Sequence, residues 1–212
     1  GKRINYLDNL ELPPQRTQEW YEFRHNMISA SSIWKVFSTE SHQNQLIHEK
    51  CIPFVQKNDF CPIDSPLEWG HKYEPLSVLW YENQYKTKVG DYGCIKHPKY
   101  PFIGASPDGI NIDPKNMRYG RMLEIKNPVT RKITGIPKFD YWIQMQIQME
   151  TCDFNECDFL ETKFVEYNSE REFLEDGSFN LSADGKNKGC IIVFTDNGKV
   201  HLINESTKRI IS

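Results

Sequence analysis

The stretch "GASPDGINIDPKNMRYGRMLEIKNP", residues 104–128, decides the fold, because it holds two apolar runs joined by a turn-forming segment. In a strand, the side chains of Glu124 and Lys126 point to the same face about 6.6 Å apart, while Ile125 points to the other face. Asp108 ends the preceding run, and a hairpin would bring it level with Glu124. The stretch therefore predicts neighbouring strands that direct two carboxylates and an ammonium group at one place.

Two carboxylates at one place repel each other unless a cation lies between them. Hard oxygen ligands favour Mg²⁺ or Mn²⁺, and such an ion can polarise a phosphate and generate hydroxide near neutral pH. A lysine beside it could orient water or stabilise charge on phosphorus. The alternative is a charged hairpin facing water, since Glu-x-Lys and Pro-Asp-Gly are both common. The apolar flanks favour central strands, where unused charges would be costly.

The composition predicts a globular protein without a membrane-spanning segment. The 212 residues are 38% hydrophobic and 13% aromatic, with a net charge of −3, so any contact with nucleic acid must rest on local positive charge. No apolar run approaches about 18 residues. The six cysteines form no C-x-x-C pair and no signal peptide is visible, which predicts reduced thiols in an intracellular compartment, the cytoplasm or nucleus of a host if the protein is viral.

Periodicity predicts helices in the first part of the chain and strands, interrupted by one helix, in the second. The expected helices are residues 15–28 with Thr17 as cap, 29–38, 41–54, and 65–86 with a kink at Pro75. The expected strands are residues 88–98, 100–112 and 120–128, arranged as a meander, then 157–167 and 189–205, the last with a "DNGK" hairpin turn. The acidic residues 166–176 predict a solvated loop or helix.

Residues 138–150, "KFDYWIQMQIQME", carry conflicting signals. Alternation of Gln with Ile and Met fits a half-polar strand, whereas the helix-forming composition and the spacing of Tyr141 and Met145 fit a helix. We predict a helix. The whole chain is then α/β, and we expect one domain over residues 1–212, with N-terminal helices at about 16–87 and a sheet and helix at about 88–204.

The order P-D…E-x-K resembles the PD-(D/E)XK nuclease superfamily, and three further stretches narrow the resemblance. They are "EWYEFRHNMISAS" at 19–31, "LEWGHKYEP" at 67–75 and "YWIQMQIQM" at 141–149. Their order is similar to that in the family of phage lambda exonuclease and YqaJ-like viral recombinases, over roughly Thr17 to Met149. The resemblance implies a restriction-endonuclease-like core, a central mixed β-sheet flanked by helices, with an N-terminal helical region.

The resemblance also implies roles for particular residues. Asp108, Glu124 and the Ile125 carbonyl would bind metal, Glu74 would help to hold a second ion, and Lys126 would be the catalytic lysine. Gln146 would lie at the edge of the active site. Arg24 and Ser31 would bind a terminal 5′-phosphate, and Arg offers a bidentate fork for such a group. Each has a simpler alternative: a surface Arg, an N-cap Ser, a solvated Glu or a buried amide bonded to backbone.

The implied activity is a Mg²⁺- or Mn²⁺-dependent 5′ exonuclease, with two ions, that acts on double-stranded DNA with a 5′-phosphate end. A single-strand annealing protein is the expected partner, and an oligomer is compatible with the resemblance. A structure-specific DNA or RNA endonuclease and a non-catalytic nucleic-acid-binding module remain alternatives. Basic residues around the predicted meander suggest a positive groove: Lys96, Lys99, Arg118, Arg121, Arg131, Lys132 and Lys138.

Overall fold

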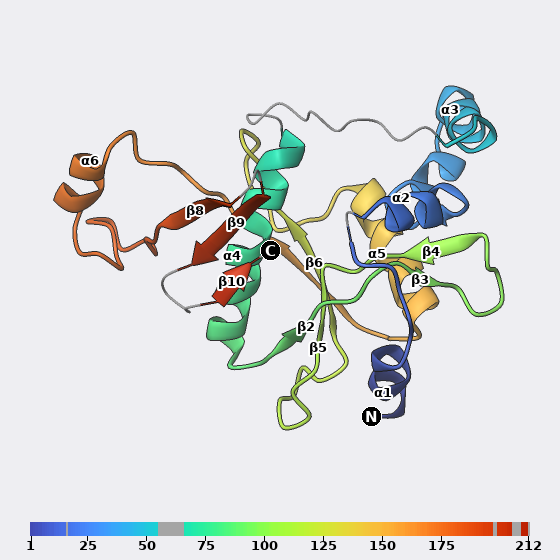
Figure 1. Cartoon of the computed structure of the whole chain (residues 1–212), viewed down its shortest axis with the longest axis horizontal. Coiled ribbons are helices and arrows are strands. Elements are labelled where there is room, and N and C mark those ends of the chain that lie inside the picture. Colours follow the sequence, from blue (N-terminus) through green and yellow to red (C-terminus); the bar gives the residue numbers. More distant parts are fainter. Residues whose placement is uncertain (16, 55–65, 197–198, 205–208, 212) are drawn as a thin grey trace. The chain divides into compact units, whose positions relative to one another are not determined.

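The computed structural model describes residues 1–15, 17–54, 66–196, 199–204 and 209–211. The chain divides into two compact units, residues 1–162 and 163–212 (Figure 1). All the residues expected in the site belong to the first unit. A single domain over residues 1–212 stays a prediction. In the described part of the chain, no helix is both long and apolar enough to cross a membrane.

Helices dominate the N-terminal part of the first unit, as the sequence predicts for residues 16–87, and a helix at residues 2–8 was not predicted. They are α1 (Lys2–Asp8), α2 (Gln18–His25), the 3₁₀ helix η1 (Ile33–Phe37), α3 (Glu40–Cys51) and α4 (Pro66–Tyr85). Thr17 caps α2, because its side chain accepts a hydrogen bond from the backbone N–H of Trp20. The predicted helix over residues 29–38 is wrong in its first part. The backbone N–H groups of Ile28 and Ala30 bond to Phe102 and Gly104, so this segment pairs as a strand before the short helix begins.

Two mixed sheets follow, in place of the predicted meander. One has the order β2-β5-β6-β7, and the other β1-β4-β3. Their strands are β1 (Ile28–Ser29), β2 (Val89–Gly90), β3 (Ile95–Lys96), β4 (Ile103–Ala105), β5 (Gly109–Asn111), β6 (Met122–Lys126) and β7 (Cys157–Glu161). The chain leaves one sheet after Ala105 and enters the other at Gly109. Pro107, which has no N–H for a ladder, lies in this crossing.

The helices α4 and α5 (Phe139–Cys152) cover opposite faces of β6, which confirms the predicted helix in the glutamine-rich segment (Figure 1). On one face, Leu123 and Ile125 pack with Tyr81 of α4. On the other face, Met122 packs in the main core with Cys152 of α5. The alternation of strand side chains thus places Glu124 and Lys126 on the α5 side of the sheet.

The second unit contains α6 (Glu170–Glu175) and an antiparallel sheet of order β10-β9-β8. Its strands are β8 (Ile191–Asp196), β9 (Lys199–Asn204) and β10 (Arg209–Ile211). Asp196 pairs with Lys199, as a hairpin requires, and the two central residues of the predicted turn lie outside the described residues. The acidic segment forms the short α6, one of the two forms that the sequence predicts.

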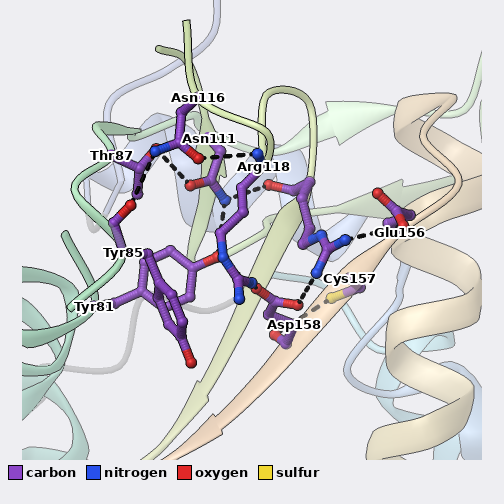
Figure 2. Close-up of polar contacts among 10 residues, drawn as sticks. Tyr81, Tyr85, Thr87, Asn111, Asn116, Arg118, Glu156, Cys157 and Asp158 are labelled. Atoms are coloured by element: carbon purple, nitrogen blue, oxygen red, sulfur yellow. Dashed lines mark hydrogen bonds and ion pairs between the residues drawn. The ribbon is translucent and has the colours of Figure 1, made fainter. Parts of the chain in front are cut away.

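A polar network fastens the start of β6 and β7 to α4 (Figure 2). The Asp158 carboxylate accepts hydrogen bonds from the Tyr81 hydroxyl at 2.5 Å and from Arg121 at 3.0 Å, and it also pairs with Arg118. Burial, together with the hydrogen bond to Asp158, raises the pKa of Tyr81 to about 12. The Arg118 guanidinium lies 3.6 Å from the ring centroid of Tyr85. These two arginines therefore bind the protein's own carboxylates. They do not contribute free positive charge to the basic groove expected from the sequence.

We expect Asp158→Ala to lower the free energy of unfolding by about 2–3 kcal/mol, because it leaves two guanidinium groups and a buried hydroxyl without their acceptor. Urea denaturation would measure the loss. Glu156→Gln is the matched control, since the Glu156 side chain is 61% exposed and, among the described residues, pairs with Arg121 alone. That control should cost less than about 1 kcal/mol. Equal losses in the two variants would contradict the structural role of Asp158.

Candidate active site

Asp108 and Glu124 face each other across β5 and β6. Gly109 pairs with Leu123 in an antiparallel ladder, so Asp108, one residue earlier, lies level with Glu124, one residue later. The Asp108 Oδ2 atom accepts a hydrogen bond from the backbone N–H of Ile125 at 2.6 Å. The hairpin geometry expected from the sequence is therefore present, and Asp108 is fixed directly to the strand that carries the second acid.

The carboxylate of Glu124 is fully buried, and both its oxygens have partners. The Lys126 ammonium contacts Oε1, and the Nε2 atom of Gln148 donates to Oε2 at 2.8 Å. The same ammonium lies 5.0 Å from the ring centroid of Tyr141. A buried carboxylate is costly unless it is paired and hydrogen-bonded, so this side of the sheet is organised around one negative charge.

Glu74 influences the same acids through its charge. Burial raises the pKa of Asp108 well above its usual range, and the charges of Glu124 and Glu74 raise it further. Burial by itself would lower the pKa of Lys126, but Glu124 and Asp108 outweigh this and raise it. The structure thus brings Asp108, Glu124 and Lys126 together, with Glu74 close enough to influence Asp108.

A hydroxyl–amide network positions the helix that carries Glu74. Asn127, which directly follows Lys126, accepts hydrogen bonds from Ser77 at 2.8 Å and from Thr162 at 2.6 Å. Its amide also donates to the carbonyl of Gly70 at 3.2 Å. Gly70 and Ser77 lie on either side of Glu74 in α4, so the network fixes the turn of helix that directs Glu74 to the acids.

The structure does not bring Gln146 to the acids. Gln146 is exposed, whereas Gln148 is buried, donates to Glu124 and lies 3.5 Å from the carbonyl of Ser106. The reason is helical geometry: residues seven apart share a face, so Gln148 follows Tyr141, and Gln146 points away. This spacing was visible in the sequence. Gln144 is also buried on the covered part of α5.

A second cluster surrounds Arg24, at the end of α2. Its guanidinium donates to the hydroxyls of Ser106 at 3.0 Å and Ser31 at 3.4 Å, and it stacks on Trp20 with the ring centroid 4.4 Å away. Within the described ranges, no carboxylate forms an ion pair with Arg24. Burial lowers the pKa of this guanidinium, and the group nevertheless stays charged at neutral pH. A desolvated cation that has hydroxyl and aromatic neighbours but no carboxylate among the described residues is suited to bind an anion.

Lys50 and Ser106 also belong to this cluster, and no motif in the sequence indicates either of them. The Lys50 ammonium donates to the carbonyls of Arg24 at 3.1 Å and His25 at 3.2 Å, which places a second positive charge at the end of α2. Ser106 stands two residues before Asp108. Two residues of chain span at most about 7 Å, so the backbone of Ser106 in the Arg24 cluster lies within about 7 Å of the backbone of Asp108.

The residues near Glu124 suit a divalent cation by their chemistry. The carboxylates are hard oxygen ligands, and the buried amide oxygen of Gln148 has no hydrogen-bond partner. Among the described residues, however, no three His, Cys, Asp or Glu side chains are already grouped to hold a metal ion. The Lys126 ammonium contacts Glu124 and supplies the positive charge there. A metal ion would therefore compete with this ammonium for Glu124.

The sequence is similar to known proteins. Residues 19–155 match the model of the YqaJ-like viral recombinase domain. The chain is 31% identical over 215 residues to "Uncharacterized protein R354" of Acanthamoeba polyphaga mimivirus, which covers 92% of this chain and 38% of that protein. The chain thus spans about two fifths of the length of that relative.

Two crystal structures are similar to this chain in fold and in sequence. One is an alkaline exonuclease, LHK-Exo, from Laribacter hongkongensis, with 27% identity and a TM-score of 0.56 over 69% of this chain and 74% of that chain. The other is LHK-Exo in complex with dAMP, with 27% identity and a TM-score of 0.54 over 68% and 73%. The mixed α/β fold and the matched residues place this chain in the family of YqaJ-like viral recombinase domains.

Proposed function

We propose that the protein is a Mg²⁺-dependent nuclease that digests double-stranded DNA from a 5′-phosphorylated end and leaves 3′ single strands for recombination or repair. Family membership and the similarity to an alkaline exonuclease support a nuclease. One observation supports the 5′-end specificity: Ser106, which contacts Arg24, is only two residues from Asp108. A terminal phosphate bound by Arg24 would lie about one nucleotide from the acids.

In this proposal, Asp108, Glu124, the Ile125 carbonyl and Glu74 hold the metal. The bound ion would polarise the scissile phosphate and lower the pKa of water. Lys126 is fixed between Glu124 and Tyr141, where its ammonium can stabilise negative charge that develops on the phosphate.

The substrate end is held by a different part of the chain. Arg24, Ser31 and Ser106 bind the terminal phosphate, and the helix end supported by Lys50 keeps Arg24 in place. Two ions, an annealing partner, an oligomer and an intracellular site of action stay predictions.

Digestion of linear and circular duplexes tests this function. With Mg²⁺, we expect loss of linear 5′-phosphorylated duplex, no cutting of circles, and no reaction in EDTA. Asp108→Asn should lower the rate by about 100-fold or more, because it removes a charge from the metal site. Asp113→Asn, in the turn between β5 and β6, is the matched control and should act as wild type. Equal cutting of circles would favour an endonuclease, and unchanged activity of Asp108→Asn would exclude this site.

Arg24→Ala tests the recognition of the end. We expect the preference for 5′-phosphate over 5′-hydroxyl duplexes to fall by about 10- to 100-fold, since hydrogen bonds to a charged group contribute about 1.5–3 kcal/mol. Competition between the two substrates in one reaction would measure this ratio. Arg171→Ala, at an 84% exposed arginine of the second unit, is the control. An unaltered ratio in Arg24→Ala would reject the 5′-phosphate pocket.

The two glutamines can be separated by a paired substitution. Gln148→Leu should lower nuclease activity by about 10- to 100-fold, because residues that orient metal ligands have effects of that size. Gln146→Leu should have an effect of less than about threefold, since Gln146 is exposed. Initial rates with saturating Mg²⁺ provide the measurement. The reverse order of effects would restore Gln146 as the active-site glutamine.

A further inference from the structure

Two large aromatic side chains stand in the solvent at the beginning of α5. The rings of Phe139 and Trp142 lie at an interplanar angle of 11°, with centroids 6.2 Å apart. Their residues are 66% and 49% exposed. They are three positions apart in the helix, which makes them neighbours on its surface. We call this pair the aromatic platform. Exposed apolar side chains that gather in one place mark a binding surface.

The geometry of the aromatic platform is suited to flat ligands. Of the described aromatic pairs, Phe139–Trp142 has the smallest interplanar angle, whereas the exposed Tyr100–Phe102 pair is tilted by 56°. Parallel ring faces are the surface on which unpaired bases stack. The bases of an intact duplex are already stacked on each other, so the platform favours a single strand over a duplex.

The charge beside the platform suits a phosphate backbone. Lys138 immediately precedes α5 and Lys132 lies in the loop before it, and neither has an acidic partner among the described residues. Arg131 of the same loop is neutralised by Glu161. Asp140 is the acidic residue in the first turn of α5. A cation without a described acidic partner, Lys138, beside two exposed rings is typical of a groove for single-stranded nucleic acid.

The platform also begins beside the active site. The ring centroid of Tyr141 lies 5.0 Å from the Lys126 ammonium and 6.0 Å from the Lys138 ammonium. Tyr141 is thus the link between the lysine paired with Glu124 and the lysine that precedes the platform. An unpaired strand leaving the acids would meet Lys138, Phe139 and Trp142 within the first two turns of α5.

We propose that Phe139 and Trp142 stack unpaired bases of the DNA substrate or product, with Lys138 on its phosphates. This inference rests on the proposed function, because it extends that site to the strand it produces. The first turns of α5 would then hold single-stranded DNA close to Lys126.

Equilibrium binding in EDTA tests the proposal without catalysis. Fluorescence anisotropy would follow a labelled oligothymidine strand and a blunt duplex over a range of salt concentrations. Phe139→Ala and Trp142→Ala should each weaken binding of oligothymidine by about tenfold, the effect of losing one stacked base, and change binding of the duplex by less than about twofold. Trp142→Tyr should retain most of the affinity, because it keeps a ring.

The salt dependence separates stacking from charge. Lys138→Ala should reduce the slope of log affinity against log salt by about 0.7, the value for one phosphate contact on a single strand, whereas Trp142→Ala should leave the slope unchanged. Tyr6→Ala is the matched control for the loss of an exposed ring, since Tyr6 is 50% exposed on α1 and lies outside the platform. Thermal melting would confirm that each variant is folded.

Three results would overturn the proposal. The first is an unchanged affinity for oligothymidine in a folded Trp142→Ala variant. The second is an equal loss of affinity for the single strand and the duplex. The third is a wild-type protein that self-associates, together with a Trp142→Ala variant that is monomeric but keeps its affinity for oligothymidine. The last would assign the platform to a second copy of the chain. Nuclease inactivity together with platform-dependent strand binding would reject the proposed function and leave the platform intact.

Discussion

A carboxylate that is completely removed from water is the constraint around which the first unit is built. The charge of Glu124 is tolerated because Lys126 and Gln148 satisfy its two oxygens. Those partners come from the same strand and from α5, so the helix has to pack directly on this face of β6. Asp108 can approach because its own carboxylate takes the N–H of Ile125. The result is a negative, dry place that suits a cation and, through the cation, a phosphate.

The strand that carries this charge is held at both ends. At its start, Arg118 and Arg121 converge on Asp158 and connect β6 to β7 and α4 (Figure 2). At its end, Asn127 joins Ser77 of α4 to Thr162. Both networks support this strand with hydrogen bonds that are buried or half-buried in the protein.

The same networks decide which positive charges are available to a substrate. Arg118, Arg121 and Arg131 lie in the basic stretch of sequence, but each is paired with a carboxylate. Among the described residues, Arg24 pairs with no carboxylate, and Lys138 lies beside the exposed rings of the aromatic platform. Arg24 and Lys138 are therefore cations near the acids that no described carboxylate neutralises. With a net charge of −3, the proposed binding of phosphates has to rest on such local positive charge.

The sequence by itself determined the local facts: the cap at Thr17, the shared face of Glu124 and Lys126, and the helix over the glutamine-rich segment. These follow from hydrogen bonds and periodicities within a few residues. The tertiary structure decided that the chain changes sheet between Ala105 and Gly109 and that Gln148 meets Glu124. It also joined Ser106 to Arg24. Such contacts connect residues far apart in the chain, and their partners depend on which faces are buried, which local pattern does not specify.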